Sequence, residues 1–93
     1  MIRSFASRET ERVWRGEWSR RLPAEVQRLG LRKLQIMDAV ADVSELRVPP
    51  GNQLEALKGD RKGQWSIRIN GQWRICFRWV NGHAEDIEIC DYH

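Results

Sequence analysis

The sequence predicts a small α+β domain in which two N-terminal helices cover one face of an antiparallel β-sheet. Between residues 23 and 41, apolar residues recur every three or four positions, as they do in an amphipathic helix. From Trp65 onwards the pattern changes, and apolar and polar residues alternate in three runs, as in half-buried strands. Asn-Gly pairs at 70–71 and 81–82 separate these runs, which is typical of β-hairpins. We therefore expect a three-stranded C-terminal meander.

The first five residues are predicted to add an edge strand, with Ile2 and Phe5 against the core. Ser7 or Thr10 is expected to cap a first helix, which ends near Gly16. The buried side of this helix is predicted to carry Val13 and Trp14, and Trp18 is expected to anchor the linker or the next turn.

A second helix is predicted to begin with Pro23 in its first turn and to run for 18 to 20 residues, as far as Ala41. Its apolar face carries Val26, Leu29, Leu34, Met37, Val40 and Ala41. Its outward face carries Arg28, Arg32, Lys33 and Asp38. We interpret that outward face first as a solvated surface.

A loop at residues 48–52 (Val-Pro-Pro-Gly-Asn) divides the helical half of the chain from the β half. After it, Leu54 and Leu57 are expected to reach the core, so that Glu55 and Lys58 point elsewhere. Residues 59–63 form a polar turn flanked by glycines, without the spacing of a phosphate-binding P-loop.

The parity of the apolar positions predicts the hairpin register. A two-residue turn at Asn70-Gly71 would pair Ile69 with Gln72 and would place the apolar residues of the two strands on opposite faces. A three-residue connection with Gly71 in the left-handed conformation pairs Arg68 with Gln72 and avoids this conflict. The same argument at 81–82 aligns Ile87 and Ile89 with Phe77 and Ile75. A bulge is therefore predicted in both hairpins.

Length and composition limit the possible roles. Ninety-three residues form one domain, residues 1–93, and neither a membrane-spanning stretch nor a signal peptide is evident, so a cytoplasmic protein is expected. Cys76 and Cys90 are then reduced and most simply structural. Two cysteines and two histidines lie far apart in the sequence, so we predict no metal and no cofactor.

Positive charge is concentrated in one part of the chain. The formal net charge is +3, but residues 58–78 contain six cations against one acid, Asp60. Such a stretch favours a polyanionic partner, although a solvated face is the simpler reading. The register places Arg68, Arg74 and Arg78 on the face opposite the helices and brings Arg74 near Glu88, Cys90 or Tyr92.

Metal-free RNA cleavage requires groups of the kinds found at the C-terminal end. A base must take the proton of the 2′-hydroxyl, cations must stabilise the phosphorane, and an acid must protonate the leaving 5′-oxygen. Histidine can act as acid or base near neutral pH, arginine and lysine bind phosphate oxygens, and tyrosine can stack on a base. The terminal residues Asp91, Tyr92 and His93 together with nearby cations therefore suggest RNA chemistry.

Several segments at fixed spacing carry a resemblance: Val48 to Asn52, Leu54 to Arg61, Gly63 to Ile67, Gln72 to Ile75 and Asp91 to His93. In these segments the chain resembles the HigB family of bacterial toxins, within the RelE/ParE superfamily. The resemblance implies a RelE-like fold and a toxin that cuts mRNA on translating ribosomes. It also implies a HigA-type helix-turn-helix antitoxin, usually encoded just downstream, through which alone the toxin would reach operator DNA.

The resemblance also implies residue roles. His93 would be the general acid or base, and Lys58 and Arg74 would stabilise the transition state. Asp91 would orient His93 or share proton transfer, and Tyr92 would position the nucleotide. Contacts to RNA are expected from Glu55, Arg61, Lys62, Arg68 and Arg78.

Glu55 departs from the family pattern, because some relatives have histidine at this position. Either Glu55 replaces that histidine as a carboxylate base, or the position is not needed here. Two other functions are open on the sequence: a ParE-like poison of DNA gyrase that is not an enzyme, and a simple RNA-binding module.

Overall fold

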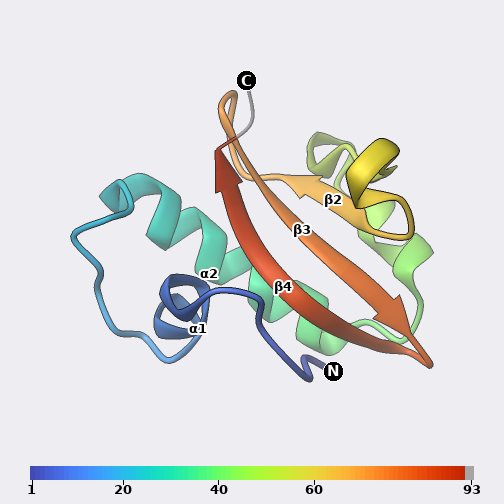
Figure 1. Cartoon of the computed structure of the whole chain (residues 1–93), viewed down its shortest axis with the longest axis horizontal. Coiled ribbons are helices and arrows are strands. Elements are labelled where there is room, and N and C mark those ends of the chain that lie inside the picture. The colour runs from blue at the N-terminus through green and yellow to red at the C-terminus, as the bar shows by residue number, and fades with distance from the viewer. Residues whose placement is uncertain (92–93) are drawn as a thin grey trace.

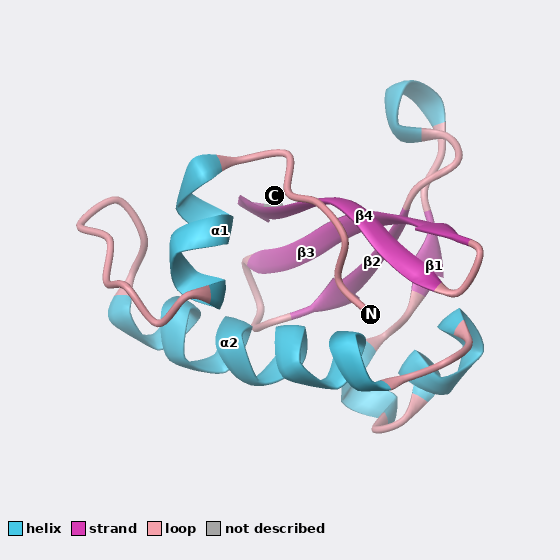
Figure 2. Cartoon of the chain, turned by 90° about the horizontal axis from the view of Figure 1, so that it is seen from below, coloured by secondary structure: helices cyan, strands magenta, loops and turns pink. Residues whose placement is uncertain are grey.

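The computed structural model describes residues 1–91 and has the predicted α+β architecture. Helices α1 (Arg8–Trp14) and α2 (Ala24–Ala39) lie on one side of a four-stranded antiparallel sheet of order β1-β2-β3-β4 (Figures 1 and 2). The strands are β1 (Glu55–Ala56), β2 (Trp65–Arg68), β3 (Trp73–Val80) and β4 (His83–Asp91). Three short 3-10 helices precede β1 or join it to β2: η1 (Val43–Arg47), η2 (Pro50–Asn52) and η3 (Gly59–Arg61). No helix within residues 1–91 has the length and apolar character needed to cross a membrane.

Both helices form where the sequence predicts them, with different ends. Ser7 caps α1, because its hydroxyl accepts a hydrogen bond from the Thr10 amide at 3.2 Å. Gly16, with φ of +78°, follows the end of α1 as expected. The expectation that Trp18 anchors the linker or the next turn was wrong, since the residue is 66% exposed. Helix α2 has 16 residues, because Pro23 precedes it as the N-cap and Val40 is already extended.

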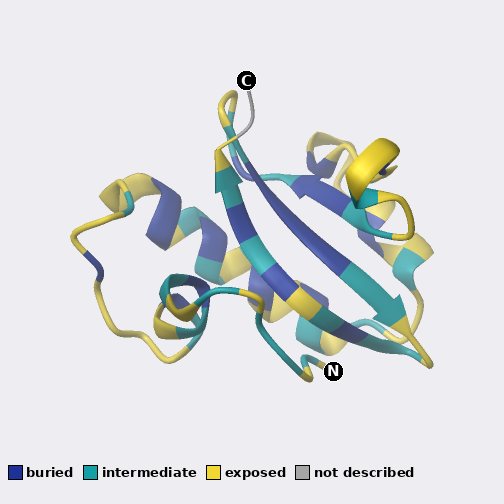
Figure 3. Cartoon of the chain, viewed as in Figure 1, coloured by how far each residue is buried: buried dark blue, intermediate teal, exposed yellow. Residues whose placement is uncertain are grey.

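The core lies between α2 and the sheet. On the sheet it includes odd-numbered residues of β2 and β3, of which Ile67, Ile75 and Phe77 are fully buried, together with Ala84, Ile87 and Ile89 of β4 (Figure 3). Gly30 brings α2 close to this surface: a Cβ atom there would lie 3.4 Å from Cδ1 of Ile89. The parity argument therefore assigns the helix-facing side of these strands correctly.

The first hairpin keeps the predicted parity but differs in register. Arg68 pairs with Arg74 rather than with Gln72, so the connection is two residues longer than expected. Gly71 does not adopt the left-handed conformation. Instead, Oδ1 of Asn70 accepts hydrogen bonds from the amides of Gln72 and Trp73, each at 2.9 Å. This Asx-type turn replaces the predicted glycine bulge.

The second hairpin contains the predicted bulge, but not at its turn. Asn81 and Gly82 have φ of +50° and +82° and form a two-residue turn that pairs Val80 with His83. The bulge lies within the strands, at Asp86 (φ +51°), where the register shifts opposite the stretch between Cys76 and Arg78. Beyond it Ile75 pairs with Ile89, as predicted.

The N-terminal segment runs beside β4 but does not form the predicted continuous edge strand. It makes two isolated parallel bridges, Ile2 with Ala84 and Phe5 with Ile87 (Figure 1). Thr10, which is fully buried at the start of α1, accepts a hydrogen bond from the Ile89 amide at 2.9 Å. The fourth strand of the sheet is instead the two-residue β1 on the opposite edge.

Candidate active site

Arg74 is the central cation of the sheet face that turns away from the helices. Its residue exposure is only 8%, so its guanidinium needs acceptors within the protein. Nε donates to Oγ of Ser66 at 2.8 Å, and Nη2 donates to the carbonyl of Gln53 at 2.6 Å. Nη2 also lies 3.6 Å from Oε1 of Glu55. Within the described residues Nη1 has no hydrogen-bond partner, so the guanidinium is oriented and still has donors to offer.

Strand register explains why these groups meet. Glu55 on β1 pairs with Ser66 on β2, and β3 lies on the far side of β2. The side chains of Glu55, Ser66 and Arg74 therefore project from three adjacent strands onto one face.

The loop before β1 supplies the third acceptor. Gln53 has φ of +44°, and its amide donates to the carbonyl of Pro50 at 3.0 Å. The preceding Asn52 is fully buried, and its Nδ2 donates to the carbonyls of Leu46 and Val48 at 3.1 and 3.3 Å. Asn52 thereby holds the 48–52 loop in the shape that presents the Gln53 carbonyl to Arg74.

Arg61 lies over the same face, at the end of η3. Its Nη2 donates to Oε1 of Glu88 at 3.1 Å and lies 3.4 Å from Sγ of Cys90, while Nη1 donates to Oε1 of Gln64 at 3.0 Å. The hydrogen bond to Glu88 raises the pKa of the Arg61 guanidinium above its ordinary value. Arg61 therefore ties the η3 turn to β4.

Two thiols lie beneath Arg61. Cys76 is fully buried and Cys90 is partly buried, and the Cys90 thiol donates to the Glu88 carbonyl at 3.6 Å. The neighbouring Cys90 thiol lowers the pKa of Cys76, whereas the Cys76 thiol and burial raise the pKa of Cys90. Both cysteines are free of disulfides and packed within strands, where a structural role was expected for them. No cluster of potential metal ligands occurs among residues 1–91.

The chain matches the family model described as the RelE-like toxin HigB of type II toxin-antitoxin systems, over residues 3–93. The chain belongs to the HigB-like toxin family. It is 41% identical over 85 residues to Toxin HigB-1 of Vibrio cholerae, covering 90% of each chain. It is 36% identical over 94 residues to Endoribonuclease HigB of Proteus vulgaris, covering 100% of each. As a member of this family it is a toxin with a cognate antitoxin.

Solved structures share the RelE-like fold of this HigB-like toxin at low sequence identity. A YoeB-YefM toxin-antitoxin complex from Staphylococcus aureus contains a chain with TM-score 0.61 and 18% identity, covering 100% of this chain and 98% of that one. A YafQ mutant from E. coli gives TM-score 0.52 and 13% identity, covering 94% and 91%.

Some of the predicted site residues of this HigB-like toxin are in contact with one another, and others lie apart. Arg74 and Glu55 meet directly, and Arg74 pairs with Cys90 near the end of β4, as the register argument predicted. Lys58 is exposed just before η3, and Lys62 is exposed just after it. Arg78 forms an ion pair with Asp86 at 3.4 Å.

Of the three C-terminal candidates, the structure describes Asp91. Both oxygens of the Asp91 carboxylate accept hydrogen bonds from Nε2 of Gln72, at 3.1 and 3.0 Å. Asp91 pairs with Trp73, and strand alternation points its side chain to the face opposite Cys90 and Arg74. Tyr92 and His93 lie outside the described residues.

Three supporting residues were missed by sequence reasoning: Ser66, Gln53 and Lys33. Ser66 could have been found because its even-numbered position places it on the same face as Arg74. Gln53 acts through its backbone carbonyl, and the residue type does not predict such a contact. Lys33 was assigned to a solvated face, yet its ammonium donates to Oδ1 of Asn52. Burial, and then the charge of Arg68, lower the pKa of Lys33. Lys33 and Arg68 therefore add positive charge near the 48–52 loop, which Lys33 contacts through Asn52.

Proposed function

We propose that this toxin is a ribosome-dependent endoribonuclease that cleaves mRNA in the ribosomal A site without a metal ion. The observation that carries the proposal is the full-length relationship, at 36% identity, to a protein named Endoribonuclease HigB. The oriented guanidinium of Arg74 supports it, because a fixed cation with free donors suits a phosphate whose charge increases in the transition state.

The proposed reaction is attack of the 2′-oxygen on the adjacent phosphorus. The 2′-hydroxyl loses its proton to a base, the bond from phosphorus to the 5′-oxygen breaks, and an acid protonates that oxygen. The products are a 2′,3′-cyclic phosphate and a 5′-hydroxyl end. His93 is proposed as the acid or base, with Asp91 orienting it or sharing the transfer, and Tyr92 positions the nucleotide.

Arg74 and Lys58 are proposed to stabilise the phosphorane. The side-chain ammonium of Lys58 has no hydrogen-bond or ion-pair partner among residues 1–91, so it is available to RNA. Glu55 is proposed to form an ion pair with Arg74 in the free toxin. When a phosphate of the RNA replaces Glu55 beside Arg74, the released carboxylate is proposed to accept a proton. Further contacts to RNA are assigned to Arg61, Lys62, Arg68 and Arg78.

The proposed partners follow from this activity. They are the bacterial ribosome, its bound mRNA and a HigA-type helix-turn-helix antitoxin, with operator DNA reached only through the antitoxin. The proposed place of action is the cytoplasm.

The test is to map mRNA 5′ ends in a reconstituted translation reaction with and without the purified toxin. New internal ends bearing 5′-hydroxyl groups, present only when ribosomes translate, are the expected result. The His93→Ala variant should bind ribosomes without producing these ends. Growth arrest with DNA damage and intact transcripts would instead indicate a gyrase poison, and salt-sensitive RNA binding without cleavage would indicate a binding module.

A further inference from the structure

The turn between β1 and β2 carries Lys58 and is not held in place by apolar packing. Lys58 directly precedes η3, and its carbonyl accepts a hydrogen bond from the Arg61 amide at 3.3 Å. None of the η3 residues, Gly59–Arg61, is buried (Figure 3). Exposed segments with few buried contacts open readily unless polar contacts hold them. The position of the Lys58 ammonium therefore depends on the polar contacts of this turn.

The guanidinium of Arg61 makes such contacts. Its Nη1 donates to Oε1 of Gln64 at 3.0 Å, which closes the turn on itself. Its Nη2 donates to Oε1 of Glu88 at 3.1 Å and lies 3.4 Å from Sγ of Cys90, which attaches the turn to β4. Of these three acceptors Glu88 carries a charge, and a hydrogen bond between charged groups is stronger than one between neutral groups. The Arg61–Glu88 ion pair is therefore the main link between the turn and β4.

Glu88 faces the same side of the sheet as Arg74. Arg74 pairs with Cys90, and Glu88 lies two residues before Cys90 on β4. Side chains two positions apart on a strand project from the same face. Arg61 therefore connects the turn that carries Lys58 with the strand that lies directly beside Arg74.

We propose that Glu88 is a positioning residue, which holds Arg61 and thereby fixes the turn so that Lys58 and Arg74 act on the same phosphate. The inference rests on the proposed nuclease function and gives a role to a residue that does not itself bind RNA. Two cations that stabilise one phosphorane must be held at a fixed separation, because small displacements of a reacting group cost much of the rate. A carboxylate that binds the turn from β4 provides this constraint.

The negative charge of Glu88 separates this role from simple attraction of RNA. If the cations of this face acted only by attracting phosphates, removal of an acid would strengthen ribosome binding and would not slow cleavage. If Glu88 positions Lys58, its removal slows cleavage even though the toxin becomes more positively charged. The two roles therefore predict changes of opposite sign.

The test measures cleavage and binding separately on ribosomes programmed with a defined mRNA. For Glu88→Ala, the single-turnover rate constant at saturating toxin should fall by about 10- to 100-fold, as expected when a catalytic group is displaced by about 1 Å. The dissociation constant for the ribosome should not increase. Glu88→Gln should lose less activity, because its amide oxygen can still accept a hydrogen bond from Arg61.

A double-mutant cycle tests whether Glu88 acts through Lys58. In the Lys58→Ala background, cleavage is slower and is followed over longer times. Glu88→Ala should then have little further effect on the rate constant, because the group that it positions is absent.

Hydrogen exchange of the free toxin tests the attachment of the turn without cleavage. The amides of Arg61 and Lys62 donate to the carbonyls of Lys58 and Gly59 at 3.3 and 3.1 Å, and both should exchange faster in Glu88→Ala. The urea midpoint should change little, since one partly exposed ion pair contributes little to global stability.

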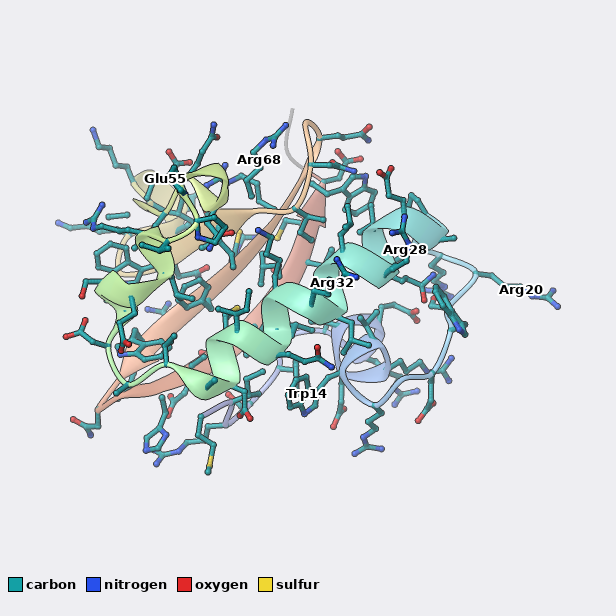
Figure 4. All side chains as sticks on the ribbon, turned by 180° about the vertical axis from the view of Figure 1, so that it is seen from behind. Trp14, Arg20, Arg28, Arg32, Glu55 and Arg68 are labelled. Atoms are coloured by element: carbon teal, nitrogen blue, oxygen red, sulfur yellow. The ribbon has the colours of Figure 1, made fainter. Side chains whose placement is uncertain are left out.

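The matched control is Glu25→Ala, which removes an exposed carboxylate from the first turn of α2. Figure 4 shows Arg28, three residues beyond Glu25, well apart from Glu55. Glu25→Ala changes the net charge as Glu88→Ala does, and should leave both the cleavage rate and the exchange of the η3 amides unchanged.

Slower cleavage with undiminished ribosome affinity, faster exchange in η3 and loss of the effect in the Lys58→Ala background support the proposal. A Glu88→Ala rate constant within about twofold of that of the unmodified toxin would overturn it, as would a full effect in the Lys58→Ala background. Unchanged exchange in η3 would also overturn it. In each of these cases the unmodified toxin still cleaves mRNA, whereas absence of that cleavage would refute the proposed function itself.

Discussion

The two faces of the sheet are stabilised in different ways. Toward the helices, Ile67, Ile75 and Phe77 are buried in an apolar core. On the other face, Ser66 and Arg74 are almost as buried, but polar groups surround them, and each depends on a specific hydrogen bond. Apolar packing tolerates small shifts, whereas a buried guanidinium requires acceptors at fixed positions. The first face therefore stabilises the fold, and the second orients the Arg74 guanidinium.

The largest expected effect tests the apolar face. Phe77→Ala removes a fully buried ring and should lower the free energy of unfolding by about 3 to 5 kcal/mol. Urea unfolding followed by circular dichroism measures this change. Val80→Ala, on the same strand but 38% exposed, is the control and should cost less than about 1 kcal/mol. Equal costs for the two variants would show that the core has been misplaced.

The next effect tests the polar face through activity. Arg74→Lys keeps the charge but cannot donate to Ser66 and to the Gln53 carbonyl in the same planar geometry. Cleavage of mRNA in a translation reaction should fall by about 10²- to 10³-fold, as when an oriented transition-state donor is lost. The exposed Arg47→Lys variant should cleave normally. Full activity of folded Arg74→Lys toxin would mean that charge alone suffices there.

Ser66→Ala separates orientation from charge on the same face. It leaves the buried Nε of Arg74 without its acceptor, and should lower the free energy of unfolding by about 1 to 3 kcal/mol. A double-mutant cycle with Arg74→Ala measures the coupling, because Ser66→Ala should cost clearly less once the guanidinium is absent. Additive costs would contradict the proposed role of Ser66. Ser44→Ala, at an exposed position of η1, is the control.

The smallest effect concerns Lys33, which lies on α2 and donates to Asn52. Burial and the charge of Arg68 lower the pKa of its ammonium below the usual 10.5. Between the pKa of Lys33 in the folded chain and its higher pKa in the unfolded chain, the unfolded chain binds more protons. The contribution of Lys33 to the free energy of unfolding therefore rises as pH increases. Lys33→Met should remove that contribution in urea titrations from about pH 8 to pH 11. The exposed Lys62→Met variant should retain it.

The apolar face was predictable and the polar face only partly so. Alternation of Ile67, Ile75 and Phe77 reports directly which side of a strand is buried, and the pairing of Ile75 with Ile89 followed from it. The turns were mispredicted because one side-chain oxygen, that of Asn70, forms the first turn, and because the second bulge sits at Asp86 rather than beside the Asn-Gly pair.

Sequence reasoning placed Arg74 beside Cys90 but missed what orients its guanidinium. The Gln53 carbonyl reaches it only because Asn52 holds the preceding loop, and such a contact depends on tertiary structure rather than on residue type. The resemblance to the family includes the 48–52 segment, and the hydrogen bonds of Asn52 show that this segment positions the carbonyl that binds Arg74.

The bridges between the N-terminal segment and β4 have a consequence for folding. Ile2 and Phe5 find their partners, Ala84 and Ile87, in the described strand that is farthest from them in sequence (Figure 1). Until β4 is in place, β3 lacks its longer neighbour and α1 lacks the amide of Ile89 that donates to Thr10. Since contacts this distant in sequence are slow to form, we expect the N-terminal segment and the start of α1 to dock late in folding.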